Sequence, residues 1–214
     1  KYISLERAAA LSLLYVPSDS FSALEREIQD NRKKGMEELQ GALDSIPSKD
    51  RLSIASTVED VRKSYADLQK FQKAFDTESR EPKSAGLPDL PDEYFEKTTG
   101  LIDKIDELIE TYSTPTFMFS PEINRQMRLT RLIWEISEYA GKEYAILGRL
   151  IAENRFPDRQ TRETLIALRS RIQYGLELTH GAVENSQWKR ELTPALEEAE
   201  THYSMIFEQI KEVF

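Results

Sequence analysis

The segment from residue 120 to residue 154 reads SPEINRQMRLTRLIWEISEYAGKEYAILGRLIAEN and decides the fold class. Its apolar residues recur at steps of three and four, which puts them on one stripe of an α-helix that packs against other helices. These residues are Leu129, Ile133, Ile136, Ala140, Tyr144, Leu147 and Ile151. Ser120, Pro121 and Glu122 supply a cap, a proline in the first turn and an acidic residue, which together are typical of a helix start.

The same spacing continues along the rest of the chain between breaks that contain proline, and no segment alternates with period two for long enough to form a strand. We therefore predict an all-α protein. The expected helices cover 2–16, 19–45, 51–79, 92–113, 120–154, 158–185 and 193–214. At about 1.5 Å per residue the fifth helix would be roughly 50 Å long. That length favours an elongated double (stacked) four-helix bundle with long shared helices over one compact bundle.

A faint internal repeat suggests how the chain is organised. Residues 6–14, ERAAALSLL, align with residues 143–151, EYAILGRLI, and a proline follows each stretch at Pro17 or Pro157. We expect one domain over 1–214 made of two helical modules, with repeats of about 1–113 and 120–214. The alternative is that two amphipathic helices align by chance.

Composition excludes several classes of site. The 214 residues contain no cysteine, two histidines and a formal net charge of −9. The chain therefore has no disulfide and no cysteine-ligated metal, and the negative charge argues against nucleic-acid binding. Glu177 and His180 have the spacing of a di-iron ligand pair, but Ala199 stands where a second pair needs its glutamate. We predict no catalytic residue, no metal, no cofactor and no enzyme activity for this part of the protein.

The two ends of the chain also carry an expectation. The chain starts at Lys1 rather than at methionine, and helical periodicity runs to both ends. No stretch reaches the ~18–20 apolar residues of a membrane span. A domain inserted between two membrane-spanning helices would have these properties, and so would a chain trimmed to its ordered core.

Polar residues that lie near the apolar stripes are the candidate ligand site. They are Arg7, Asn31, Arg131, Trp134, Tyr139, Glu143, Tyr144 and Arg149. In one interpretation several of them converge between helices, where arginine donors and aromatic walls would bind a small anion or organic acid. In the other interpretation the charged groups reach out to water, the aromatic rings belong to the core, and a polar residue on a stripe fixes the helix register.

The stretch from Leu132 to Ala145, LIWEISEYAGKEYA, resembles the extracytoplasmic, all-helical sensor domains of bacterial histidine kinases and methyl-accepting chemotaxis receptors, of the nitrate/nitrite-sensing or helical bimodular type. Relatives commonly read EYAGRERA there, and Lys142 and Tyr144 stand at the two arginines. Glu6 and Arg7 resemble the Glu-Arg pair near the start of nitrate-sensing domains.

The resemblance implies two stacked four-helix bundles and membrane-spanning helices outside this chain. The function it implies is that of a periplasmic sensor domain, whose last helix shifts when a small molecule binds and carries the signal across the membrane. The ligand would be an organic acid, an anion or an aromatic compound, and the full-length receptor would be a homodimer. A sensor histidine kinase is the first expectation and a chemoreceptor the second. A cytoplasmic helical scaffold or adaptor is the alternative from another class.

Overall fold

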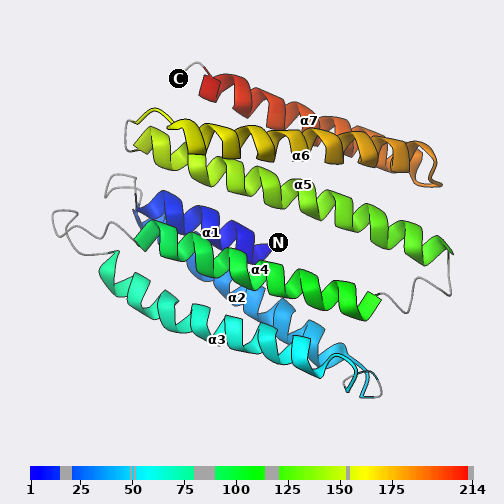
Figure 1. Cartoon of the computed structure of the whole chain (residues 1–214), viewed down its shortest axis with the longest axis horizontal. Helices are drawn as coiled ribbons and strands as arrows, with labels where there is room; N and C mark the ends of the chain where they lie inside the picture. The colour runs from blue at the N-terminus through cyan, green and yellow to red at the C-terminus, as the bar shows by residue number, and fades with distance from the viewer. Residues whose placement is uncertain are drawn as a thin grey trace. The chain divides into compact units, whose positions relative to one another are not determined.

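The computed structural model describes residues 1–14, 21–48, 50, 52–79, 90–113, 121–152 and 155–211, which hold seven α-helices and no strand (Figure 1). The all-α prediction is confirmed. The helices are α1 (Tyr2–Leu13), α2 (Phe21–Ser45), α3 (Ala55–Glu78), α4 (Leu90–Ser113), α5 (Pro121–Ala152), α6 (Arg159–Glu184) and α7 (Lys189–Lys211). Each matches one predicted helix.

The chain divides into two compact units, one from Lys1 to Met118 and one from Phe119 to Phe214. The first contains α1 to α4 and the second contains α5 to α7, so each helix belongs to a single unit. The prediction of two four-helix bundles that share long helices is therefore not confirmed. Only the first unit holds four helices, and the described part of the second holds three.

The first unit is a four-helix bundle in which α1 packs against α2 and α4, and α3 packs against α4. Its core forms because the apolar stripes of α2, α3 and α4 meet. The buried residues of this cluster are Leu43, Ile46, Ile54, Val61, Leu68, Leu101 and Leu108. Where α1 meets α2, the small side chains of Ala9 and Ala10 are buried on α1, and Gly35 of α2 lies against Ile3.

In the second unit α6 packs against both α5 and α7 (Figure 1). Leu129, Leu147 and Leu150 of α5 are buried, as are Leu168, Ile172, Leu176 and Val183 of α6. Gly175 marks the closest approach of α5 and α6, because a Cβ atom at this position would lie 2.7 Å from Cγ1 of Ile136. This distance is shorter than carbon atoms tolerate, so a side chain here would force Ile136 or a helix to shift.

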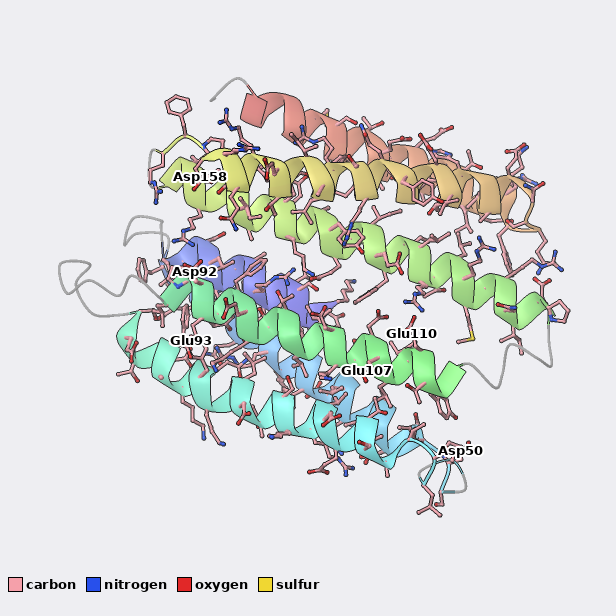
Figure 2. All side chains as sticks on the ribbon, in the orientation of Figure 1. Asp50, Asp92, Glu93, Glu107, Glu110 and Asp158 are labelled. Carbon is pink, nitrogen blue, oxygen red and sulfur yellow. The ribbon has the colours of Figure 1, made fainter. Side chains whose placement is uncertain are left out.

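Helix starts follow the expected chemistry in two places. Asp158 caps α6 by accepting a 2.8 Å hydrogen bond from the backbone N–H of Thr161. Asp92 and Glu93 lie in the first turn of α4, where acidic side chains interact favourably with the helix dipole (Figure 2).

The predicted start of the last helix, at Thr193 and Pro194, is wrong. Helix α7 begins at Lys189 and has Pro194 inside it. The backbone N–H groups of Glu191 and Leu192 already bond to the carbonyl of Trp188, at 3.1 and 2.9 Å. Because these bonds start the helix before the proline, the missing N–H of Pro194 falls in the second turn and not at the cap.

Candidate functional site

The most unusual polar group of the first unit is the carboxylate of Glu6, which is 2% exposed inside the bundle. Its Oε1 atom accepts hydrogen bonds from Arg32 Nε at 3.0 Å, Gln72 Nε2 at 2.6 Å and the Tyr94 hydroxyl at 2.5 Å. The three donors belong to α2, α3 and α4, while Glu6 belongs to α1. One buried oxygen thus links all four helices of this bundle.

The surroundings of Glu6 extend this link. Arg32 also bonds both carboxylate oxygens of Asp76, at 2.7 and 3.2 Å, in a two-pronged ion pair. The Tyr94 ring packs edge-on against Phe71 and Phe75, with centroids 5.6 and 4.6 Å away. Burial raises the pKa of Glu6, and the hydrogen bond from Tyr94 and the charge of Arg32 act against this rise.

Burial and the neighbouring Glu6 carboxylate also raise the pKa of Tyr94. The tyrosine hydroxyl therefore keeps its proton and remains a hydrogen-bond donor to Glu6 across the physiological range. The cluster is arranged to hold helices together, since its donors all point at one acceptor. It does not present an open nucleophile or base to a substrate.

The second unit has a buried carboxylate of its own at Glu143, which is 1% exposed on α5. Arg169 Nη2 on α6 lies 2.5 Å from its Oε1, and the Tyr203 hydroxyl on α7 lies 2.5 Å from its Oε2. The ring of Tyr144 contacts that of Tyr203, at 6.4 Å between centroids. Burial and the hydrogen bond to Glu143 raise the pKa of Tyr203, so its hydroxyl stays protonated as a donor.

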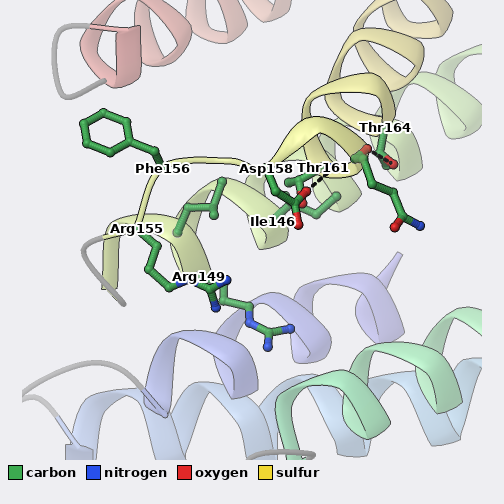
Figure 3. Close-up of a pocket in the computed structure, with 9 residues that line it drawn as sticks. Ile146, Arg149, Arg155, Phe156, Asp158, Thr161 and Thr164 are labelled. Carbon is green, nitrogen blue, oxygen red and sulfur yellow. Dashed lines mark hydrogen bonds between the residues drawn. The ribbon is translucent and has the colours of Figure 1, made fainter.

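A cavity of about 350 Å³ lies where α5 ends and α6 begins (Figure 3). Its lining combines cationic, acidic, hydroxyl and apolar side chains. The lining residues are Ile146, Arg149, Leu150, Arg155, Phe156, Asp158, Gln160, Thr161 and Thr164. Guanidinium donors beside an apolar wall suit a small organic acid, whose carboxylate they can bind with two bonds. The volume is in the range of small-molecule pockets.

The predicted site residues of the first unit are both buried. Arg7 is 1% exposed on α1, donates a 2.8 Å hydrogen bond to Thr99 Oγ1, and lies over the ring of Phe95 at 5.0 Å. Asn31 is buried on α2. These two residues are polar members of the helix packing.

The predicted residues of the second unit are spread along α5. Glu143 and Tyr144 meet at Tyr203, and Arg149 lines the cavity described above. The others lie elsewhere on the helix: Arg131 bonds Glu135 at 2.9 Å, the Tyr139 ring lies under Arg171 at 5.2 Å, and Trp134 is half-buried. The structure thus brings Glu143 and Tyr144 together at Tyr203, and of the predicted residues only Arg149 lines the described cavity.

Five residues that complete the two carboxylate clusters were not predicted: Arg32, Gln72, Tyr94, Arg169 and Tyr203. One signal could have found the two arginines. Each lies 26 residues after its glutamate, on the next helix of the chain. If the alignment of residues 6–14 with residues 143–151 is continued into the next helix of each module, Arg32 aligns with Arg169.

The described ranges hold no group of three or more His, Asp and Glu side chains placed to bind a metal ion. Nor do these ranges contain a helix both long and apolar enough to span a lipid bilayer. Comparison with protein-family models, with curated proteins and with solved structures gives no match.

Proposed function

We propose that this chain is the ligand-binding, extracytoplasmic sensor domain of a transmembrane signalling receptor, with a sensor histidine kinase as the first candidate for the whole protein. A methyl-accepting chemotaxis receptor is the second. The proposal starts from the resemblance of the stretch Leu132–Ala145 to such sensors. This stretch lies on α5 and contains Glu143.

The Glu143 cluster is the observation that carries the proposal. A single carboxylate on α5 is bonded to Arg169 of α6 and to Tyr203 of α7. Because a hydrogen bond is directional and limited in length, α7 cannot slide along α5 and α6 without breaking the Tyr203 bond. A ligand that favours one packing of α5 and α6 would therefore change the position of α7, and shifts of about 1–2 Å are typical of such signals.

The cavity beside Arg149 and Arg155 is the ligand site that this proposal favours, and its chemistry favours a small organic acid. It lies at the α5–α6 connection, so a bound ligand would act on the same two helices that hold Glu143 and Arg169. An inorganic anion or an aromatic compound would use only part of its lining.

A thermal-shift experiment on residues 1–214 tests the proposal. Nitrate, a four-carbon dicarboxylate and benzoate would be titrated as probes. A ligand at 100 times its Kd stabilises a domain by about 2.7 kcal/mol, which is a readable shift. We expect the dicarboxylate to raise Tm and Arg149→Ala to abolish the rise. Arg162→Ala is the matched control, because Arg162 is exposed on α6 and does not line the cavity. This variant should keep the rise in Tm.

Two results would contradict the proposal. In the first, none of the three probes shifts Tm at any concentration tested. In the second, Arg149→Ala and Arg162→Ala respond alike, which would mean that the shift arises from ionic strength. Either result would favour the alternative class, a cytoplasmic helical scaffold that binds partner helices and needs no small ligand.

A further inference from the structure

The hairpins α1–α2 and α5–α6 carry the same ion pair, between a buried glutamate and a partly exposed arginine, at the same spacing. Glu6 pairs with Arg32, and Glu143 pairs with Arg169. The partners are 26 residues apart in both cases. Positions 6 and 143 differ by 137, and so do positions 32 and 169. The two ion pairs are therefore related by a single offset with no insertion or deletion between helices.

A second contact between the helices obeys the same offset. Lys34 lies over the ring of Tyr2, with 5.6 Å from Nζ to the ring centroid. Arg171 lies over the ring of Tyr139 at 5.2 Å. Positions 2 and 139 differ by 137, as do 34 and 171. Because this cation–π pair and the ion pair are separate contacts, they fix the same helix register independently.

Buried positions also match at this offset. The pairs that are buried in both hairpins are Ala10 and Leu147, Leu13 and Leu150, Asn31 and Leu168, Gly35 and Ile172, and Ile46 and Val183. Side-chain size differs within several of these pairs, which explains why the similarity is faint in the sequence. The five pairs share their burial, whereas other positions at this offset differ, such as buried Leu11 and exposed Gly148.

The two clusters differ in the helix that completes them. In the first unit Tyr94 of α4 donates to Glu6, and in the second unit Tyr203 of α7 donates to Glu143. The carboxylate and arginine thus stay constant, while the tyrosine comes from a different place in the order of helices. Both tyrosines use the hydroxyl, and both have a raised pKa caused first by burial.

We propose that α1–α2 and α5–α6 are copies of one duplicated hairpin, and that its ion pair between a buried glutamate and an arginine positions one helix through the hydroxyl of a tyrosine on that helix. The positioned helix is α4 in the first unit and α7 in the second. The proposal rests on these contacts alone and is independent of the ligand and location proposed above.

Burial explains why such a pair positions a helix. A carboxylate removed from water needs its hydrogen-bond partners, and losing one leaves a costly unsatisfied group. A slide of one residue moves a helix by about 1.5 Å, enough to break a bond to the tyrosine. Apolar contacts would tolerate the same slide more easily. The tyrosine hydroxyl therefore selects one register of its helix.

Hydrogen exchange of backbone amides in the 1–214 chain tests this positioning role. Tyr203→Phe removes the hydroxyl and keeps the ring that contacts Tyr144. We expect this variant to raise the exchange rate of α7 amides about tenfold and to leave α4 unchanged. Tyr94→Phe should do the reverse, since its hydroxyl serves Glu6. Both variants keep the apolar packing and are expected to fold, which circular dichroism would check.

Ile172→Val is the control for a merely structural effect, because Ile172 is fully buried on α6 and makes no polar bond. Ile172→Val should raise the exchange rate of backbone amides over the whole second unit and not in α7 alone. Adding Glu143→Gln to Tyr203→Phe should cost less than the sum of the two single changes, because both changes affect the bond between Glu143 and Tyr203. Unchanged α7 exchange in Tyr203→Phe, or a pattern like that of Ile172→Val, would overturn the proposal.

Discussion

Glu6 and Glu143 lie at buried positions where an apolar residue such as leucine would need no hydrogen-bond partner. Each is almost completely shielded from water, yet each accepts short hydrogen bonds from other helices. A core in which the glutamate and its polar partners were all apolar would be comparably stable, whereas replacing the glutamate alone would leave its buried donors without an acceptor. The hydrogen bonds contribute specificity instead, since they determine which side chains of neighbouring helices contact each other.

The raised pKa of Glu6 should make the stability of the protein depend on pH. Burial holds its pKa above the ordinary value of 4.5, so the folded state binds the proton more tightly than the unfolded state. Its contribution to stability is therefore fully present below about pH 4.5 and is lost as pH rises through the folded pKa. Glu6→Gln cannot titrate. The free energy of unfolding of the wild type relative to this variant should fall between pH 4.5 and neutral.

Urea denaturation at several pH values from 4.5 to 7.5 measures this difference. The slope with urea should stay constant, which would show that the two-state comparison is valid. A difference between wild type and Glu6→Gln that does not change with pH, or that grows as pH rises, would contradict the shift.

Single residues also show where prediction from sequence stops. Arg7, Asn31 and Glu143 are polar residues that lie near the apolar stripes of the sequence, and all three are buried. Their partners could not be selected in the same way, because Tyr94 lies 88 residues from Glu6 and Tyr203 lies 60 residues from Glu143. Helical periodicity predicts on which face of a helix a residue lies. The side chain that it contacts depends on how the helices pack.

At the scale of helices, the closest contact is that between α5 and α6 at Gly175. A methyl group there would meet Ile136 at 2.7 Å, whereas a methyl group at Gly148 of α5 would meet nothing within 4 Å. Helix periodicity predicted both helices but could not distinguish these glycines. Both lie inside helices, where glycine is unfavourable, and only the neighbouring helix supplies a reason to keep one of them.

The two glycines make a matched pair of variants. Gly175→Ala should destabilise the second unit by about 1–2 kcal/mol, because the crowding outweighs the gain in helix propensity. Gly148→Ala should stabilise it by up to about 1 kcal/mol. Chemical denaturation of both variants would show the opposite signs. If both changes stabilise the protein, α5 and α6 do not approach as closely as described.

The start of helix α7 was predicted four residues too late, and that of α3 four residues too early. Threonine followed by proline is a frequent helix start, so the sequence favoured position 193. The bonds to the carbonyl of Trp188 begin the helix earlier, and Pro194 is tolerated within it. Local chemistry predicts such ends with an uncertainty of a few residues, and packing decides among them.

At the scale of the whole molecule, the periodic spacing predicted the number and order of the helices. The spacing alone does not divide them into units, because every helix has the same kind of apolar stripe; the faint repeat predicted modules of about 1–113 and 120–214, and the chain divides into Lys1–Met118 and Phe119–Phe214. A unit of four helices and one whose described part has three are both compatible with that pattern. The choice depends on which faces match in shape and on polar pairs such as Glu6 with Tyr94.

The first unit should fold by itself. Residues 1–118 contain four helices, a core of buried apolar residues from α2, α3 and α4, and the Glu6 cluster. We expect a protein of these residues to be helical by circular dichroism and to unfold cooperatively with urea. A largely unfolded chain, or a gradual transition without a midpoint, would mean that this unit has no core of its own.

The central claim is that this domain senses small molecules on the far side of a membrane, and cysteine labelling in spheroplasts tests it most directly. These 214 residues contain no cysteine, so Ser170→Cys on the exposed face of α6 gives one thiol in this part of the protein. In the full-length protein we predict that a membrane-impermeant maleimide labels this thiol in intact spheroplasts. Labelling only after the membrane is broken would contradict the sensor proposal and favour a cytoplasmic scaffold.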